Sequence, residues 1–332
     1  MVAGHQVNPW RFCVAPMLDW TDRHCRYFHR QLSRHARLYT EMITTGALLH
    51  GDVARHLDFD AAEHPVALQL GGSEPAELAQ CARLAERWVY DEVNLNCGCP
   101  SERVQRGAFG ACPMAEPALV AECIRAMQDA VSIPVTVKHR IGLDRGEDYG
   151  FVRDFVGTLF DAGCRVFIVH ARNAWLRGLS PKENREVPPL RYDVVYRLKQ
   201  DFSQAIIVLN GGLTSLAQAA EELRQVDGVM LGRVAYHDPY VLAEVDREFF
   251  GAAAPPPSRE RIVATMATYA ERVAAAGTRP RAVTQHMLGL YLGQRGARQW
   301  RRLLSDPVFL DEHGAGALAD AQRRMQRESV PT

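Results

Sequence analysis

The chain has 332 residues, of which 47% are hydrophobic and 23% charged, values that are typical of a globular protein and exclude a disordered or fibrous one. Its 39 basic and 39 acidic residues cancel, so we do not expect a uniformly polybasic nucleic-acid binder, although a local basic face fits this balance. No apolar run reaches the roughly 18 residues of a membrane-spanning helix. The first residues carry no basic, apolar leader, and the eight cysteines are scattered, so we expect a cytoplasmic protein without a membrane partner.

Eight short apolar runs predict eight β-strands, and amphipathic stretches between them predict helices. The runs are Phe12–Ala15, Leu38–Thr40, Val66–Leu70, Glu92–Leu95, Val135–Lys138, Val166–Val169, Ile206–Leu209 and Val229–Leu231. Glu-Pro pairs at residues 74–75 and 116–117 precede two of the helical stretches, as is typical of helix starts. This pattern predicts a (β/α)8 TIM barrel. A doubly wound sheet is the alternative, but its G-x-G-x-x-G signal is absent after the first strand.

The C-terminal quarter of the chain differs from the rest. Residues 252–257 (AAAPPP) predict a linker between a barrel domain at 1–251 and a small all-helical domain at 258–332. Helices are expected at Arg259–Ala275, Arg281–Gln294, Gly296–Leu304 and Gly316–Arg327. From residue 255 onward there are 12 arginines and 7 acidic residues, a net charge of +5, so the preceding part has a net charge of −5. An acidic body therefore carries a basic tail.

Polar residues cluster where the predicted strands end, which is where barrel enzymes carry their chemistry. Asn210, Gly211 and Gly212 follow the seventh strand, and Gly232 and Arg233 follow the eighth. Glycines let backbone N–H groups approach phosphate oxygens, and an arginine adds charge, so these two turns predict a phosphate site. The alternative is that both are only tight turns.

Further candidates end the strands before these. Lys138 is one of only three lysines in the chain and could face an anionic ring or phosphate, or else form an ion pair with Glu92 or Asp144. His170, two residues before Arg172, could bind a ligand or be structural. Gln69 offers an amide suited to the edge of a heteroaromatic ring.

Cys99 lies in the sequence Asn96-Cys-Gly-Cys99-Pro after the fourth strand. A metal site is disfavoured, because no second cysteine pair or histidine pair with zinc-like spacing is present. A thiol with the usual pKa of about 8.5 is protonated at neutral pH and can donate a proton. We therefore interpret Cys99 as a nucleophile or proton donor, and Cys97, which should point the other way, as a buried structural residue.

At this point a family resemblance is visible. The motifs PML-D-W-TD (from Pro16), E-V-N-L-N-x-G-C-P, GxFGA, V-K-x-R-I-G, H-A-R, NGG and GR together resemble the tRNA-dihydrouridine synthases. The stretches at residues 39–46, 179–185 and 296–302 are similar to the A subfamily of that family. The resemblance runs from about Arg11 to Leu304. One departure is Cys97, which occupies the variable position of N-x-G-C-P, where a small aliphatic residue is usual.

The resemblance implies a flavin enzyme that binds FMN on the barrel, uses NADPH, and reduces D-loop uridines of tRNA, at positions 20 and 20a in this subfamily. The resemblance further implies that hydride would pass from reduced FMN to C6 of uracil and that Cys99 would protonate C5. The implied cofactor residues are Pro16, Met17, Leu18, Gln69, Lys138, His170, Asn210, Gly211, Gly212, Gly232 and Arg233. The implied uracil and tRNA residues are Asn96, Arg172, Lys182, Arg185, Arg298, Arg301 and Arg302. No protein partner is implied.

Two other functions remain open from the residues alone. A small-molecule flavin oxidoreductase of the dihydropyrimidine type would use the same barrel, but it does not need an arginine-rich helical tail. A catalytically silent RNA-binding barrel would not need Cys99, Lys138 and the phosphate turns. The lysine and arginine surfaces named above could also be ordinary solvated faces.

Overall fold

The computed structural model describes residues 8–100, 110–146 and 148–329, so the GxFGA motif begins outside the described residues. Residue contacts divide the chain into two units. The barrel unit comprises the chain up to Leu18 together with Ala36–Gly232, and the helical unit comprises Asp19–His35 and the chain from Arg233 onward. Residues 252–257, the predicted linker, form neither helix nor strand. The division into a barrel domain at 1–251 and an all-helical domain at 258–332 stays a prediction.

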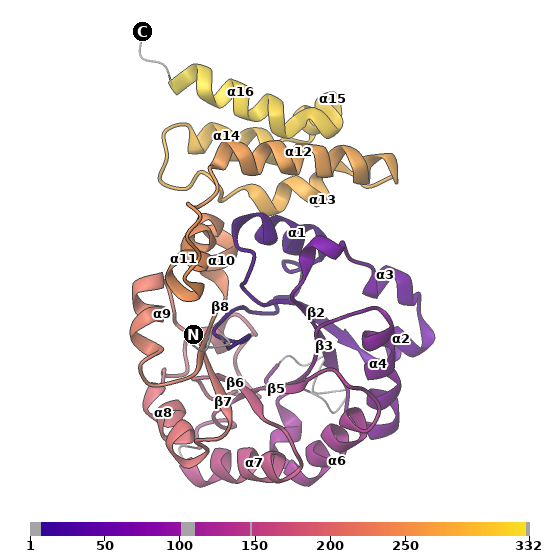
Figure 1. Cartoon of the computed structure of the whole chain (residues 1–332), viewed down its shortest axis with the longest axis vertical. Coiled ribbons are helices and arrows are strands. Elements are labelled where there is room, and N and C mark those ends of the chain that lie inside the picture. The colour runs from indigo at the N-terminus through magenta and orange to yellow at the C-terminus, as the bar shows by residue number, and fades with distance from the viewer. Residues whose placement is uncertain (1–7, 101–109, 147, 330–332) are drawn as a thin grey trace, which may run out of the picture. The chain divides into compact units, whose positions relative to one another are not determined.

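The barrel unit is built on eight parallel strands. They are β1 (Phe12–Val14), β2 (Leu38–Thr44), β3 (Val66–Gly71), β4 (Glu92–Cys97), β5 (Val135–Arg140), β6 (Val166–His170), β7 (Ile206–Asn210) and β8 (Gly228–Leu231). They pair in the order β1-β8-β7-β6-β5-β4-β3-β2. The remaining gap is bridged where Cys13 pairs with Arg37, just before β2, and the N–H of Val14 donates to the carbonyl of Arg37 at 2.9 Å. The strands form a ring (Figure 1), which confirms the predicted TIM barrel.

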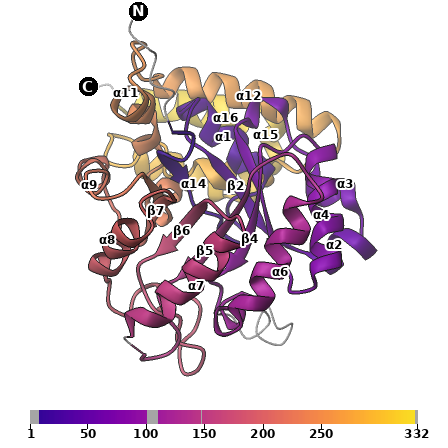
Figure 2. The ribbon, with the colours of Figure 1, turned by 60° about the horizontal axis from the view of Figure 1, so that its bottom comes forward.

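Helices connect the strands around the outside of this ring. They are α2 (Thr45–His50), α3 (Val53–Leu57), α4 (Pro75–Arg87), α6 (Pro117–Gln128), α7 (Tyr149–Asp161), α8 (Tyr192–Asp201) and α9 (Leu216–Glu222), with short 3-10 turns η1 (Ala61–Glu63), η2 (Cys112–Ala115) and η3 (Glu183–Arg185). Figure 2 shows α4, α6 and α7 along the outside of β4 and β5. Proline begins α4 and α6, as the sequence predicts, because its fixed φ suits the first helical turn and its missing N–H costs nothing there.

The inside of the barrel is filled by alternate residues of the strands. One buried apolar cluster joins residues from strands on opposite sides of the ring, which they can do only through its interior: Trp10, Cys13, Ala15, Tyr39, Ala67, Val166, Ile168, Val208 and Met230. Because side chains alternate along a strand, Gln69, His170 and Asn210 face the same interior two residues further along β3, β6 and β7. These positions bring polar side chains to one end of a mostly apolar core.

The helical unit contains α1 (Arg23–Leu32), α10 (Arg233–His237), η4 (Pro239–Glu244), α11 (Val245–Phe250), α12 (Arg259–Ala275), α13 (Pro280–Thr284), η5 (Gln285–Met287), α14 (Ala297–Ser305), α15 (Pro307–His313), η6 (Gly314–Gly316) and α16 (Ala317–Ser329). The segment around α1 joins it through specific contacts. The rings of Tyr27 and Tyr269 stack at 3.9 Å, and the Asp22 carboxylate lies 3.1 Å from Nε2 of the buried His286. The helix after the first strand therefore packs on α12.

One predicted helix of this unit is wrong. The stretch Arg281–Gln294 is not one continuous helix. The helix α13 ends at Thr284, η5 continues to Met287, and turns follow. A Cβ at Gly289 would lie 2.2 Å from the carbonyl oxygen of His237, and Gly293 has a φ of +76°. Close approach to α10 therefore breaks the helix here. A helix that was not among those predicted, α15, begins at Pro307 and is capped by Asp306.

All eight cysteines are free thiols. Within the described part of the chain, no helix combines the length and apolar character that crossing a membrane requires.

Candidate active site

Candidate residues from neighbouring strands meet at the carboxyl end of the barrel. Asn96 of β4 is in register with Lys138 of β5, and His170 of β6 with Asn210 of β7. Registered residues of parallel strands point to the same face of the sheet. The side chain of Asn96 donates from Nδ2 to Oε1 of Gln69 at 2.9 Å, which ties β4 to β3 at this level. Five side chains predicted from strand ends therefore share the interior face.

The loop that carries Cys99 is held by side chains of β4 and β5. The backbone N–H groups of Gly98 and Cys99 both donate to Oδ1 of Asn96, at 3.1 and 3.0 Å. Nε of Arg140 donates to the carbonyl of Gly98 at 3.1 Å. Cys97, in contrast, is 1% exposed, and burial raises the pKa of its thiol. Cys97 is thus packed away, whereas Cys99 is half-buried on an anchored loop.

Burial and mutual repulsion change the charge state of the basic groups around Cys99. Burial lowers the pKa of Lys138 to about 7, with a further lowering by Arg140, while the nearby Cys99 raises it. Burial also lowers the pKa of Arg140 to about 9. The pKa of His170 is held well below its usual value by burial and then by Arg140, so this imidazole is neutral at neutral pH. A site in which such basic side chains are not outnumbered by carboxylates favours an electron-rich or anionic ligand.

The alternative reading of Lys138, an ion pair with Glu92, is not what the structure has. That carboxylate instead pairs with Arg37 at 3.0 Å in the barrel interior. Among the described residues, no carboxylate lies within ion-pair distance of the Lys138 ammonium, which leaves it available to a ligand.

The turn after β7 is shaped as a cradle. Gly211 and Gly212 have φ values of +109° and +73°, which glycine adopts without strain. A Cβ at Gly211 would lie 2.5 Å from Cδ2 of His170, so the turn lies directly against that ring. The carbonyl of Gly211 accepts a hydrogen bond from the Tyr192 hydroxyl at 2.6 Å, and the N–H groups of both glycines make no hydrogen bond within the described part of the chain. Two N–H groups beside a histidine are suited to phosphate oxygens.

Other predicted cofactor residues lie on both sides of the division between the units. Pro16 and Met17 are half-buried after β1, and Leu18 is 69% exposed. Gly232 ends the barrel unit, and a Cβ there would meet only Ala15 at 3.9 Å. Arg233 is exposed and begins α10 of the helical unit.

Known proteins resemble this chain in sequence and in fold. Residues 13–326 match the family model described as dihydrouridine synthase (Dus). The chain belongs to this family. It is 62% identical over 298 residues to the tRNA-dihydrouridine(20/20a) synthase of Pseudomonas aeruginosa, covering 90% of each chain. It is 57% identical over 316 residues to the protein of that name from Escherichia coli O6:H1, covering 95% of this chain and 94% of that protein. The family resemblance is confirmed, and the protein is an oxidoreductase.

A solved structure, morphinone reductase, is similar in fold, with a TM-score of 0.50 and 14% sequence identity over 76% of this chain and 88% of that one. At this level of identity the likeness extends to the barrel fold alone. It agrees with the ring of parallel strands in this dihydrouridine synthase family member.

The loop between β6 and α8 contains three predicted substrate residues of this synthase. Lys182 and Arg185 are exposed. Between them lies the buried Asn184, whose backbone carbonyl accepts a hydrogen bond from NH1 of Arg140 at 2.9 Å. Because Arg140 ends β5, this hydrogen bond holds the loop to the end of that strand. NH1 of Arg172 donates to the carbonyls of Glu186 and Pro188, which fixes its guanidinium on the same loop.

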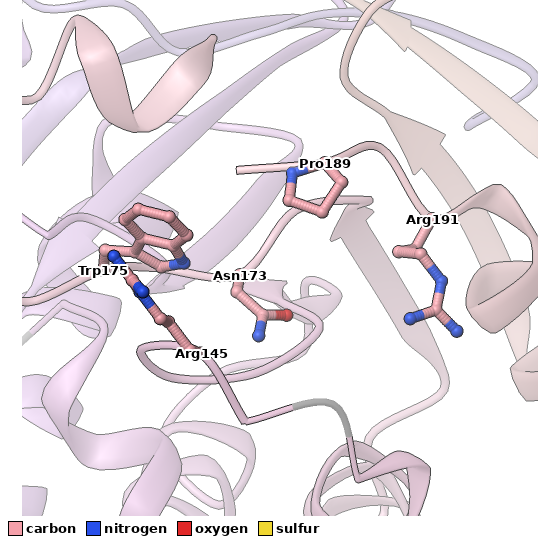
Figure 3. Close-up of a pocket in the computed structure, with 5 residues that line it drawn as sticks. All are labelled: Arg145, Asn173, Trp175, Pro189 and Arg191. Atoms are coloured by element: carbon pink, nitrogen blue, oxygen red, sulfur yellow. The ribbon is translucent and has the colours of Figure 1, made fainter. Parts of the chain in front are cut away.

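A pocket of about 340 Å³ opens beside this loop (Figure 3). It is lined by Arg145, Asn173, Trp175, Pro189 and Arg191. The guanidinium of Arg145 lies 4.9 Å from the centre of the Trp175 ring. An aromatic face and two guanidinium groups suit a base or a phosphate group.

The predicted arginines of the helical unit lie on α14. Arg298, Arg301 and Arg302 are exposed, whereas Trp300 between them is buried and donates to the carbonyl of Met287 at 2.8 Å. Their spacing of three and four residues places Arg298 on the same face as the other two.

Sequence reasoning missed the residues that support the site. Arg140 ends β5, so its place at a strand end was a signal that could have found it, whereas Asn94 lies within β4. Glu92 and Thr136 could not be distinguished by sequence from ordinary strand residues, because only the closed barrel brings these two buried polar side chains together.

Proposed function

We propose that this synthase reduces uridine to 5,6-dihydrouridine in the D loop of tRNA, at positions 20 and 20a, using FMN and NADPH. The observation that carries the proposal is the thiol of Cys99 on a loop fixed by Asn96, beside Lys138 and His170, in a chain that matches a dihydrouridine synthase model over most of its length. The names of the relatives, each printed with positions 20/20a, support the D-loop positions. A cytoplasmic location is part of the same proposal.

The residues at the barrel end fit FMN. The turn at Gly211 and Gly212 supplies two N–H groups for a phosphate, and the neutral His170 beside them can accept or donate a hydrogen bond. In our proposal the cofactor residues are Pro16, Met17, Leu18, Gln69, Lys138, His170, Asn210, Gly211, Gly212, Gly232 and Arg233. When bound, FMN would take electrons from NADPH and supply the hydride that uracil C6 requires.

The chain itself supplies the proton and the orientation. Saturation of the 5,6 double bond adds a hydride at C6 and a proton at C5, so an acid must lie on the C5 side. Cys99 holds that proton on Sγ, gives it to C5, and regains one from solvent. Asn96 and Arg172 hold the uracil by hydrogen bonds, and positioning of this kind supplies a large part of the rate.

Binding of tRNA is assigned to the basic surfaces. Extruding a base from folded tRNA costs a few kcal/mol, and phosphate contacts can offset it. We assign those contacts to Lys182 and Arg185 of the barrel unit and to Arg298, Arg301 and Arg302 of α14. The arginine and tryptophan pocket fits a nucleotide that flanks the extruded uridine.

Two measurements test the proposal. Denaturing the purified protein should release FMN, and recovery of FAD or of no flavin from a fully occupied sample contradicts the cofactor. Sequencing tRNA from a strain that lacks the gene should find uridine in place of dihydrouridine at positions 20 and 20a. Unchanged dihydrouridine there, or activity on free pyrimidines without tRNA binding, would favour the small-molecule oxidoreductase instead.

A further inference from the structure

A buried carboxylate lies at the base of the hydrogen-bonded network that ends at Cys99. Glu92 is fully buried and accepts four hydrogen bonds. Their donors are Nε1 of Trp10 at 2.7 Å, NH1 of Arg37 at 3.0 Å, the hydroxyl of Tyr39 at 2.9 Å and the hydroxyl of Thr136 at 2.5 Å. A carboxylate offers only acceptors, so each of these partners must donate.

Because each partner of Glu92 must donate to it, the direction of every further hydrogen bond in the network is fixed in turn. Thr136 has a single hydroxyl hydrogen and gives it to Glu92, so it can only accept from Asn94, whose Nδ2 lies 2.7 Å away. The Oδ1 of Asn94 then faces Gln69 and accepts from its Nε2 at 2.8 Å.

The remaining links reach the reactive loop. With its Nε2 on Asn94, Gln69 turns Oε1 toward Asn96, which donates from Nδ2 at 2.9 Å. Oδ1 of Asn96 is thereby left for the backbone N–H groups of Gly98 and Cys99. In each of these hydrogen bonds the donor lies on the side of the Cys99 loop and the acceptor on the side of Glu92. Reversing any one amide would set two donors or two acceptors against each other at a buried link.

We propose that Glu92, Thr136 and Asn94 are positioning residues, which fix the amide orientation of Gln69 and Asn96 and hence the ligand-facing atoms and the Cys99 loop. The inference rests on the proposed function for the identity of the ligands. The exposed fractions agree with this assignment, because they increase along the network toward the ligand: Glu92, Asn94 and Thr136 are 0% exposed, Gln69 is 1% and Asn96 is 9% exposed. Only the end of the hydrogen-bonded network formed by Gln69 and Asn96 reaches a ligand. The second side-chain N–H hydrogen of each of these two amides is left to donate to that ligand.

The test compares Thr136→Val with Thr136→Ser. Valine keeps the shape and removes the hydroxyl, whereas serine keeps the hydroxyl and leaves a small cavity. We expect single-turnover oxidation of the reduced flavin by tRNA to slow about 10- to 100-fold in the valine variant, since misplaced reacting groups cost rates of this order. The serine variant should stay within about threefold of the parent. The visible spectrum of the bound flavin should shift in the valine variant only.

A purely packing role for Thr136 predicts the opposite order, with serine the more damaging change. Equal rates and spectra in the two variants, with an active parent, overturn the inference. A parent enzyme that binds no flavin or does not act on tRNA instead defeats the proposed function. If Thr136→Val does not accumulate as folded protein, Asn94→Leu breaks the next link, and parental rates in that variant also overturn the inference.

Discussion

The backbone N–H of Cys99 donates to the side-chain oxygen of Asn96 at 3.0 Å, so the proposed proton donor and a proposed uracil ligand are held by one hydrogen bond. The same oxygen accepts the N–H of Gly98. The position of the thiol relative to a bound base thus depends on an amide of strand β4 and not on the loop alone.

Removing the thiol should stop proton transfer without disturbing binding. For Cys99→Ala we expect retained FMN and tRNA binding and a turnover at least about 100-fold lower, because a positioned acid contributes rate factors of 10² to 10⁴. Cys97→Val is the matched control, since that cysteine is buried and packed away. Single-turnover oxidation of reduced flavin by tRNA is the assay. A dead Cys97→Val alongside a normal Cys99→Ala would mean that the acid is misassigned.

Gly211→Ala should impair cofactor retention. The substitution strains a residue at φ +109° and drives its Cβ to 2.5 Å from His170, so we expect destabilisation of about 1–3 kcal/mol and loss of bound FMN. Gly46→Ala is the control, because a Cβ there meets nothing within 4 Å. The measurements are flavin content after purification and the thermal midpoint. Full flavin occupancy in Gly211→Ala would exclude this turn as the phosphate cradle.

Lys138 should make the stability of the flavin-free protein depend on pH. Its folded pKa is about 7 against a usual value of 10.5, so the unfolded chain binds more protons between these values. The free energy of unfolding should therefore rise from about pH 7 to about pH 10, by at most about 1.4 kcal/mol per pH unit, and lose this gain as the pH falls to 7. Lys138→Met should flatten that rise, and exposed Lys182→Met should not. Denaturant unfolding across this pH range gives the slopes, and identical slopes in all three proteins contradict the lowered pKa.

Replacing Arg298 and Arg301 with alanine should weaken tRNA binding. Each arginine that binds a phosphate contributes about one unit to the log–log salt slope, so the double variant should have a slope smaller by about two, with NADPH-driven flavin reduction unaltered. A charge-matched control is the pair Arg87→Ala and Arg224→Ala, exposed residues that precede β4 and β8 at the amino-terminal end of the barrel. Affinity across a salt series is the measurement. Parallel slopes for the two double variants would place the tRNA contacts elsewhere.

The amino-acid sequence alone determined the eight strands, the barrel and the strand-end candidates, because apolar period, proline positions and strand ends are local properties. Asn96, Lys138 and His170 could be selected in this way. Only the tertiary structure decided that α1 packs on α12, and that Gly289 interrupts a predicted helix to approach His237. Only it joined Thr136 to Glu92 and to Asn94, partners separated by 44 and 42 residues. Those contacts, and the lowered pKa of Lys138, depend on the register and burial that arise when distant strands close into a ring, which no local pattern encodes.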